Sequence, residues 1–331
     1  MNVLSEKRSV WDQIPDGVAG SNVDLVISDD DCKIMKLSDE TGEGIMTMYR
    51  VFDGVYIMFN DFHMKSCYSS YQSDATMLAV DHCREGCIEM EVDDRYCCCI
   101  NQGEMRIDTR VHHKGRVRFP LHHYHGVTIG FQSGIAEQSI KEMMPAFDID
   151  IHKLLKKFCS SGETCVLSAD PSIDNLFTQL YHLPKQSRSD YFKVKVMELL
   201  VYLNGVNYEE SYSEKPYFYK NQVEKIHAMH DMITKDFSVN HTQEELAKRF
   251  GINLTTMKRC FKSIYGKPIY QYIKEYRLNR AAEMLLTERN KSVTEIAALC
   301  GYDNPGKFGQ SFRMQFGSPP LEYRKNNGRN S

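Results

Sequence analysis

The chain has 331 residues and a formal net charge of −3, with 42% hydrophobic and 26% charged residues. This length predicts two or three domains with room for apolar cores. No run of 18 apolar residues occurs, and the N-terminal sequence MNVLSEKRSV has no apolar core, so neither a membrane span nor a signal peptide is expected. Eleven scattered cysteines, an odd number, indicate a reducing cytosol rather than a disulfide scaffold. We therefore expect a cytoplasmic protein.

The charge is divided unevenly along the chain. Residues 220–331 contain 19 Lys and Arg against 11 Asp and Glu, a net +8, whereas residues 1–219 contain 22 against 33, a net −11. This asymmetry suits a basic DNA-binding module joined to an acidic domain with a different role. A chance distribution of surface charge is the alternative interpretation.

Residues 1–133 are predicted to be rich in strands. Residues 1 to about 40 are polar and allow no assignment, and short strands separated by turns follow. Between positions 87 and 92, Ile88, Met90 and Val92 alternate with other residues, which is typical of a half-buried strand. Eight closely spaced strands predict a small barrel or jelly roll. They are Ile45–Phe52, Val55–Phe59, Thr76–Val80, Cys87–Val92, Tyr96–Ile100, Met105–Thr109, Arg116–Phe119 and Gly126–Phe131.

Residues 134–203 are predicted to be helical, and residues 204–219, which contain Gly205 and Pro216, to be a linker. Asp170 should cap one helix, and Ser189 should open a longer one that carries an apolar stripe. The stripe could pack on the protein's own barrel or form a dimer interface, and the pattern leaves both possibilities open. The stripe consists of Phe192, Val196, Leu199, Leu200 and Leu203; the earlier helices are Ser139–Met144 and Ile149–Cys159.

Residues 242–324 contain one structural unit written twice. Each copy has a short helical segment closed by a glycine, followed by Phe, an aromatic residue, Gly, Pro and Tyr at matching spacings. The glycines that close the helical segments are 50 residues apart, so a repeated supersecondary unit is expected. The matching segments are EELAKRFGI (Glu244–Ile252) with TEIAALCGY (Thr294–Tyr302), and FKSIYGKPIYQY (Phe261–Tyr272) with FRMQFGSPPLEY (Phe312–Tyr323).

Each copy predicts a helix, a tight turn and a second helix. Asn253 and Asn304 are suitable N-cap residues for the second helices, and Gly266 and Gly317 are suitable stops. Such a helix-turn-helix would place its second helix in a DNA major groove. Pro268 and Pro319 fit the first turn of a following helix, and a helix from Pro268 to Leu286 connects the copies. The residues predicted to face inward are Met257, Phe261, Ile264, Phe308, Phe312 and Phe316.

With these residues in place, residues 220–329 resemble the DNA-binding domain of the AraC/XylS family of bacterial transcription regulators. The second copy, IAALCGYDNPGKFGQSFRMQFGSPPLEYR (Ile296–Arg324), matches that family's signature. The second recognition helix departs from the family pattern because it begins with Pro305 and Gly306, and because Gly306 and Gly309 supply no side chain to read bases. The resemblance over the remainder of the chain is diffuse, although DHCREGCIEMEV (Asp81–Val92) is similar to a stretch found in some members.

The resemblance implies an α+β multi-domain protein. It would comprise an effector-binding, cupin-like β domain (1–133), a helical coupling or dimerisation segment (134–203), a linker (204–219) and an all-α double helix-turn-helix domain (220–331). The implied function is regulation of transcription, usually activation, by a homodimer that binds double-stranded promoter DNA, a small-molecule effector and RNA polymerase. Effector binding would shift the relative placement of two DNA-binding domains.

The recognition helices supply the candidate DNA contacts, because these side chains lie opposite the predicted buried faces and several match base-reading positions of the family. We predict base contacts from Thr255, Lys258, Arg259, Lys307 and Gln310, and phosphate contacts from Lys262 and Arg313. If the connecting helix is rigid, it would hold the two recognition helices about 34 Å apart, one DNA turn. Candidate effector-pocket residues are Tyr56, Met58, His82, Arg84 and Glu89, with core packing or surface exposure as the alternative.

No catalytic or metal site is expected. The sequence has no P-loop, nucleotide-binding fingerprint or nucleophile elbow. Of the histidines in PLHHYHG only His123 and His125 could share a strand face, and no acidic residue follows them at a clear spacing; His112 and His113 lie upstream. The run Cys97–Cys99 is divided between two faces, where a buried cysteine acts as a small hydrophobe. We therefore predict no cofactor and no enzyme activity. The alternatives are a cupin-type metal enzyme or DNA-repair unit fused to the DNA-binding module, and a ligand-independent dimeric activator.

Overall fold

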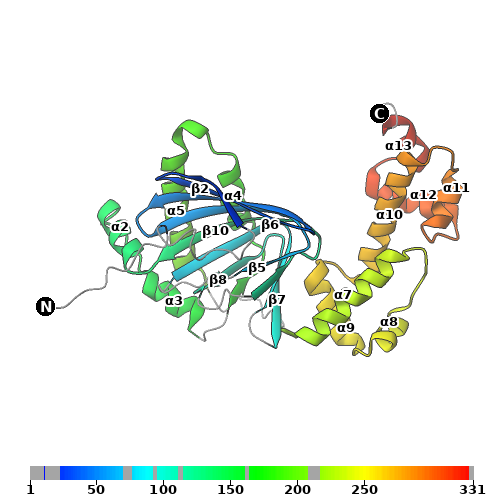
Figure 1. Ribbon diagram of the computed structural model, residues 1–331, viewed down its shortest axis with the longest axis horizontal. Helices are drawn as coiled ribbons and strands as arrows, with labels where there is room; N and C mark the ends of the chain where they lie inside the picture. Colours follow the sequence, from blue (N-terminus) through cyan, green and yellow to red (C-terminus); the bar gives the residue numbers. More distant parts are fainter. Residues whose placement is uncertain are drawn as a thin grey trace. The chain divides into compact units, whose positions relative to one another are not determined.

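The structure is a computed structural model in which the chain forms two compact units, Met1–Phe218 and Tyr219–Ser331. Figure 1 shows the strands gathered in the first unit and an all-helical second unit. The described residues are 11, 23–69, 77–91, 95–110, 115–160, 164–207 and 217–327.

The N-terminal unit is built on a curled, antiparallel half-barrel. Its strands follow the path β1-β2-β3-β4-β10-β6-β7, and β8 and β9 also pair with β6, extending to β11 and β5 respectively. The strands are β1 (Val23–Ser28), β2 (Cys32–Asp39), β3 (Gly42–Phe52), β4 (Val55–His63), β5 (Ser66–Ser69), β6 (Met77–Glu91), β7 (Tyr96–Asn101), β8 (Met105–Asp108), β9 (Gly115–Arg118), β10 (Tyr124–Gln132) and β11 (Cys165–Leu167). The prediction of an α+β protein with an N-terminal β domain is confirmed.

The long strand β6 corrects the sequence prediction of separate strands at 76–80 and 87–92. The first half of β6 pairs with β10 and β8, and its second half pairs with β7 and β9. Gly86 has a φ of 86°, and the pairing with β10 shifts register between His125 and Gly126. The interval between the two predicted strands is therefore an irregularity within one continuous strand, of the kind that bends a sheet.

Helices cover one face of the half-barrel and bury the apolar stripe of α5. α2, α3, α4 and α5 contact β10, β8, β6 and β3 respectively, as the ribbon in Figure 1 shows. All five stripe residues, from Phe192 to Leu203, lie in the core shared with the sheet, so the stripe packs on its own domain. Asp170 caps α4 as predicted, accepting a hydrogen bond from the Ser172 amide. The helices are α2 (Ile135–Met143), α3 (Ile151–Cys159), α4 (Pro171–Tyr181) and α5 (Arg188–Gly205), and a 3-10 turn (Lys185–Ser187) precedes α5.

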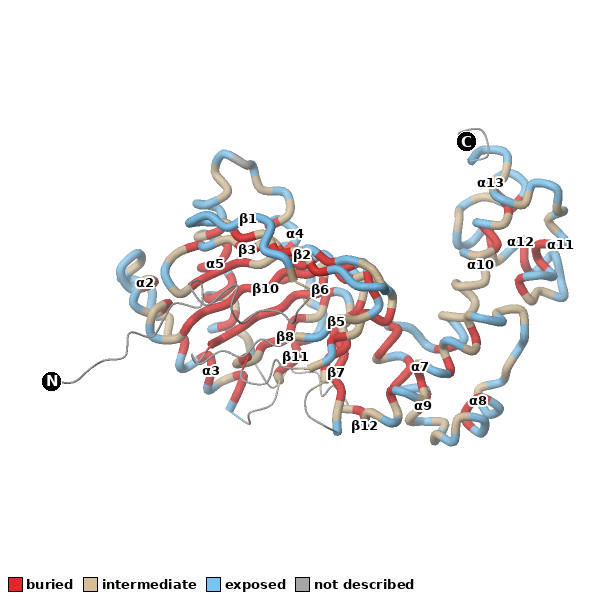
Figure 2. The backbone as a smooth tube through the Cα atoms, in the orientation of Figure 1, coloured by how far each residue is buried: buried red, intermediate tan, exposed pale blue. Residues whose placement is uncertain are grey.

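The sheet separates two apolar cores, and the alternation of side chains along its strands explains the separation. Ile57, Val80 and Ile129 point to the helix-covered core, whereas Met48, Tyr56 and Cys83 point to the concave side. Figure 2 shows burial along most of β10 and along much of β6. Because both faces are buried, the apolar pattern of these strands is denser than simple alternation would give.

The C-terminal unit contains seven helices among its described residues. They are α7 (Lys220–Lys235), α8 (Gln243–Phe250), α9 (Leu254–Tyr265), α10 (Ile269–Thr287), α11 (Val293–Leu299), α12 (Pro305–Phe316) and α13 (Pro320–Asn327). The helices α8 and α9 pack with α7, and α11 and α12 pack with α10. The predicted duplicated helix-turn-helix is therefore present, with α10 connecting the copies.

Arg277 on α10 fixes the loop that precedes α8. Its guanidinium donates hydrogen bonds to the carbonyl oxygens of Phe237 at 2.6 Å and Val239 at 3.0 Å, and to Oδ1 of Asn240 at 2.7 Å. The turn between α11 and α12 also approaches this loop, because a Cβ added at Gly301 would lie 2.4 Å from the Ser238 carbonyl oxygen. The two copies are thus joined by a packed loop as well as by α10.

Candidate nucleic-acid interface and internal cavity

The first recognition helix, α9, is fixed at both ends. The Asn253 side chain accepts hydrogen bonds from the amides of Thr255 at 2.9 Å and Thr256 at 3.3 Å, which satisfies two otherwise unpaired donors. The helix ends at Gly266, whose φ of 74° is the left-handed conformation that favours glycine. Both predicted helix boundaries are confirmed.

One face of α9 is buried and the other is open. Met257, Phe261 and Ile264 are fully buried, as predicted. The four predicted DNA contacts are all exposed, and they lie on the other side of the helix: Thr255, Lys258, Arg259 and Lys262. This arrangement leaves two lysines and one arginine available to an anionic ligand.

The second recognition helix, α12, has the same construction with a sparser polar face. Asn304 accepts a hydrogen bond from the Lys307 amide at 3.0 Å, and Gly317 ends the helix with a φ of 75°. Phe308 and Phe312 are fully buried, and Phe316 is partly buried against the same core. The predicted contacts Lys307, Gln310 and Arg313 are all exposed. An added Cβ at Gly309 would meet nothing within 4 Å, so this part of the helix surface is bare.

Comparison with known proteins identifies this unit. A family described as a helix-turn-helix domain matches residues 246–326. The HTH-type transcriptional regulator ExsA of Pseudomonas aeruginosa is 35% identical over 81 residues, which cover 24% of this chain and 29% of ExsA. The C-terminal unit belongs to the AraC/XylS family. The HTH-type transcriptional activator RhaS of Yersinia pestis is 31% identical over 104 residues, which cover 31% of this chain and 38% of RhaS.

The matches span only part of each curated relative. The matched stretches cover less than two fifths of the curated relatives, 29% of ExsA and 38% of RhaS. A solved structure of a probable AraC family transcriptional regulator from Rhodopseudomonas palustris is 26% identical, with a TM-score of 0.28, and the match covers 32% of this chain and 97% of that one.

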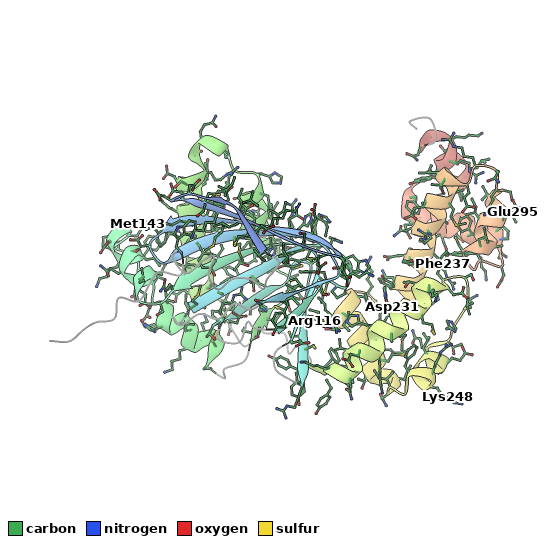
Figure 3. The ribbon with its side chains drawn as sticks, viewed as in Figure 1. Arg116, Met143, Asp231, Phe237, Lys248 and Glu295 are labelled. Carbon is green, nitrogen blue, oxygen red and sulfur yellow. The ribbon has the colours of Figure 1, made fainter. Side chains whose placement is uncertain are left out.

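The first helices of both AraC/XylS-type copies begin with the same capping arrangement. Thr242 and Glu245 exchange side-chain-to-amide hydrogen bonds at the start of α8, and Ser292 and Glu295 do so at the start of α11. The amides lower the pKa of both glutamates. In Figure 3, Lys248 on α8 and Glu295 on α11 project outward from the unit. These caps fix the helices that support the recognition helices.

The N-terminal unit, for its part, contains an internal cavity of about 130 Å³ on its concave side. Aliphatic, methionine and aromatic side chains together form most of its wall, including Met46, Met48 and Phe119. A polar group lines one part of it, namely Asn60, Asp81, Arg106, Arg110 and Thr128. Methionine-rich walls adapt to ligand shape, and a few placed polar groups would orient a ligand.

The polar group of the cavity is centred on the buried carboxylate of Asp81. Its Oδ2 lies 2.8 Å from Nε of Arg106, and its Oδ1 accepts hydrogen bonds from Arg110 at 2.5 Å and from the Thr128 hydroxyl at 2.6 Å. Burial disfavours the charged form of Asp81, but the charges of Arg110 and Arg106 outweigh it and hold its pKa well below the ordinary value. Asp81 is therefore an anion held between two buried cations.

The structure separates the five residues predicted to line an effector pocket. Tyr56 and Met58 line the cavity, and His82, Arg84 and Glu89 do not. His82 faces the helices, where Nε2 lies 2.9 Å from Oδ1 of Asp174, and the ring stacks on Phe177. Burial lowers the pKa of His82, opposed by its hydrogen bond to Asp174.

Arg84 and Glu89 have partners on other elements. The Arg84 guanidinium lies over the ring of Tyr181 on α4, 4.2 Å from its centroid. Glu89 is buried, with Oε1 3.5 Å from the Arg118 guanidinium on β9. The charged cavity residues that sequence reasoning missed are Asp81, Arg106 and Arg110. The available signal was the alternation of charged with apolar residues in MRID, which marks one consistent face of β8.

The histidines and cysteines considered as possible metal ligands lie in different parts of the N-terminal unit. His123 and His125 are neighbours, with ring centroids 6.1 Å apart, whereas His112 and His113 lie outside the described residues. An acidic neighbour comes from β4, because Asp61 pairs in register with His125. Cys97, Cys98 and Cys99 are all buried. Within the part of the chain that the structure describes, no helix has the length and apolar character needed to cross a membrane.

Proposed function

We propose that the protein is a DNA-binding transcriptional regulator. The observation that carries this proposal is the pair of recognition helices, each capped by asparagine, buried on one face and exposing polar and basic side chains on the other. They lie in a module whose net charge is +8 (19 Lys and Arg against 11 Asp and Glu in residues 220–331), which favours association with phosphate backbones.

In this proposal each recognition helix contacts both bases and phosphates of the DNA, in successive major grooves. Arg259, Lys258 and Thr255 read base edges in one major groove, because Arg and Lys match the O6 and N7 acceptors of guanine. Lys262, one turn along, contacts phosphate. Lys307 and Gln310 read the next groove with fewer side chains, and Arg313 contacts phosphate there. We expect α9 to contribute most of the sequence preference, because Gly306 and Gly309 reduce the reading surface of α12.

The cavity of the N-terminal unit binds a small effector in this proposal. A volume of about 130 Å³ with a mainly apolar wall suits a small, largely apolar molecule carrying one polar group, which the cluster around Asp81 and Thr128 would orient. The effector class is testable by a thermal-shift screen of small metabolites on the full chain. Absence of any stabilising compound would favour the ligand-independent dimeric activator.

A homodimer is the proposed assembly, and α5 offers a surface for it. Opposite the buried stripe, α5 exposes Tyr191, Val194 and Val201, with exposed fractions of 43%, 60% and 50%. These residues are spaced as neighbours on one helix face. We propose that this face, rather than the buried stripe, forms contacts between protomers, and that the dimer activates transcription with RNA polymerase at promoter DNA.

The test of the DNA-binding role compares Arg259→Ala with Lys262→Ala. Fluorescence anisotropy at fixed salt would measure binding to a selected operator and to a scrambled duplex. Arg259→Ala should lose roughly 1–3 kcal/mol on the operator and little on the scrambled duplex, because it removes a base contact. Lys262→Ala should weaken both and reduce the slope of log K against log salt by about 0.9.

Lys235→Ala is the matched control, because it removes one exposed positive charge from the end of α7 rather than from a recognition helix. It should leave the ratio of operator to scrambled binding unchanged. Equal losses on both duplexes for Arg259→Ala would contradict the base-reading role, and no binding to any duplex would contradict the proposed function.

A further inference from the structure

A cluster of metal-ligating side chains lies at one end of the half-barrel, outside the cavity. Asp61 and His63 are two residues apart on β4, so they share one face, and His125 pairs directly with Asp61 from the neighbouring strand β10. One ligand atom from each of the three residues lies within 4.8 Å of the others. Two side chains of the cluster are well exposed, Asp61 at 53% and His63 at 60%, and His125 is 28% exposed.

The donor atoms of the cluster converge on one point. Oδ1 of Asp61 lies 3.0 Å from Nε2 of His63 and 3.0 Å from Nε2 of His125. The two Nε2 atoms are 3.4 Å apart. In a tetrahedral zinc site with metal–ligand distances of about 2.0–2.1 Å, neighbouring ligand atoms are about 3.3 Å apart. The triangle therefore has the dimensions of one face of such a tetrahedron and leaves a fourth position toward solvent.

A second carboxylate lies behind His125, on the side away from the triangle. Glu85 of β6 pairs in register with His125, and its Oε2 lies 4.0 Å from Nδ1 of the imidazole. The register shift between His125 and Gly126 brings Glu85, rather than Arg84, opposite His125. Metal-binding histidines commonly have a carboxylate near the ring nitrogen that does not bind the metal, which fixes the tautomer and ring orientation.

The donor set selects the class of ion. Two imidazole nitrogens and one carboxylate oxygen suit Zn²⁺, Co²⁺ or Ni²⁺, whereas Mg²⁺ and Ca²⁺ prefer oxygen ligands alone. Hydrogen bonds from both imidazoles to Asp61 are the metal-free alternative for the same contacts. That alternative also includes a hydrogen bond between the two Nε2 atoms, and it predicts no zinc binding that depends on these residues or on Glu85.

We propose that Asp61, His63 and His125 form a binding site for a divalent transition-metal ion of the zinc class, with Glu85 as a positioning residue for His125. The bound ion would join β4 to β10 at the open end of the half-barrel. This site goes beyond the proposed regulatory function and does not depend on it.

The test is equilibrium dialysis of the metal-stripped full chain against Zn²⁺, comparing wild type with His63→Ala/His125→Ala and with Asp61→Asn. Wild type should bind one more equivalent than the double variant, and Asp61→Asn should lose the same equivalent. Glu85→Gln should keep the stoichiometry and bind about 10–100-fold more weakly, as expected for an outer partner. The fluorescence of Trp11, the only tryptophan, would verify folding of the unit in every variant.

Two controls separate this site from other zinc-binding groups. His152→Ala removes an exposed histidine that also has a carboxylate partner, Glu137 at 3.5 Å, but belongs to no such cluster among the residues that the structure describes, and it should bind zinc like wild type. Substitution by Co²⁺ should give ligand-field absorption without thiolate-to-cobalt charge transfer, which would appear if cysteines held the ion. Equal stoichiometry and affinity in wild type and the double variant, or no zinc bound by wild type, would overturn the proposal.

Discussion

Asp81 is the buried carboxylate at the centre of an ion cluster in the N-terminal unit. It is buried between Arg106 and Arg110, and Asp108 also contacts both arginines, at 3.1 Å and 3.4 Å. Removal of one partner from a buried ion cluster leaves the opposite charge uncompensated, which costs far more than the net contribution of an intact pair. The intact cluster therefore favours one specific conformation, and it adds little to the overall free energy of unfolding.

We predict that Asp81→Asn lowers the free energy of unfolding of the N-terminal unit by about 3–5 kcal/mol, because two buried guanidiniums lose a shared anion. Urea denaturation followed by Trp11 fluorescence would measure this loss. Asp108→Asn is the matched control, because Asp108 contacts the same arginines but is more exposed. An equal loss for both variants would contradict the central role of Asp81.

The same comparison has a pH dependence. The pKa of Asp81 in the folded state lies below the ordinary pKa of an aspartate. The ionised carboxylate therefore contributes its full share of the free energy of unfolding above the ordinary pKa, and this share is lost as the pH falls toward the folded-state pKa. The stability difference between wild type and Asp81→Asn should accordingly shrink below about pH 4. A difference that stays constant to lower pH would show that Asp81 does not titrate as described.

Local sequence patterns found some of these residues and could not find others. Asn253, Asn304 and the exposed side chains of α9 were predictable, because capping and helical periodicity depend on a few neighbouring residues. Strand alternation in MRID places Arg106 opposite the apolar face, but that face ordinarily meets solvent, so the position of Arg106 in a cavity was not predictable. Only the curvature of the half-barrel encloses that second face, and curvature depends on pairing between distant strands.

At the scale of elements, two glycines of the second helix-turn-helix have opposite requirements. Gly301 has a φ of 76°, and an added Cβ would lie 2.4 Å from the Ser238 carbonyl oxygen. Gly309 lies within α12, and an added Cβ there would meet nothing within 4 Å. The same substitution should therefore have opposite effects at positions eight residues apart.

We predict that Gly309→Ala raises the free energy of unfolding of the C-terminal unit by about 0.5–1 kcal/mol, because alanine restricts the unfolded chain and favours helix. Gly301→Ala should lower it by more than about 1 kcal/mol, through a strained φ and a backbone clash. Native-state hydrogen exchange of the α12 amides in the full chain would measure both. Changes of the same sign would show that backbone conformation does not control these positions.

Helices were predicted better than strands, for a physical reason. The helix signals at Gly251, Asn253 and Gly317 act within one turn of chain, and the structure reproduces them. β6 was divided into two strands because Glu85–Gly86 has turn chemistry, yet pairing with β10 continues through it. β1, β2, β5 and β11 were missed, because β1 is mostly exposed, β5 and β11 are very short, and the alternation in β2 includes polar residues.

For the whole molecule, the central question is whether the two helix-turn-helix copies bind DNA as one body. α10 alone would fix their separation only if it stayed rigid, but Arg277 adds three hydrogen bonds from α10 to the loop before α8. Gly301 packs the second copy against the same loop. Two linked binding modules gain affinity only when their geometry permits simultaneous engagement. The loop at 237–240 is thus a physical connection that both copies share.

Arg277→Lys should therefore weaken binding to an operator of two successive grooves by roughly tenfold. When the two helix-turn-helix copies are held less rigidly, binding of one copy raises the effective concentration of the other at its groove by a smaller factor. The substitution keeps the positive charge, but lysine cannot reproduce the planar arrangement of donors that reaches Phe237, Val239 and Asn240. Binding to a duplex that carries only the α9 half of the operator should be nearly unchanged. Fluorescence anisotropy at fixed salt would compare the two duplexes.

Arg280→Lys on the same helix is the matched control: Arg280 forms an ion pair with Glu283 of its own helix and lies over the Phe237 ring at 5.8 Å, contacts that a lysine can keep, and the three hydrogen bonds of Arg277 to the loop remain. It should leave both affinities near wild type. An operator with five base pairs inserted between the halves should bind wild type and Arg277→Lys similarly, since half a turn places the second groove on the opposite side of the duplex. Wild-type affinity that is insensitive to this insertion would mean that the copies bind independently, and Arg277 would then have only a local structural role.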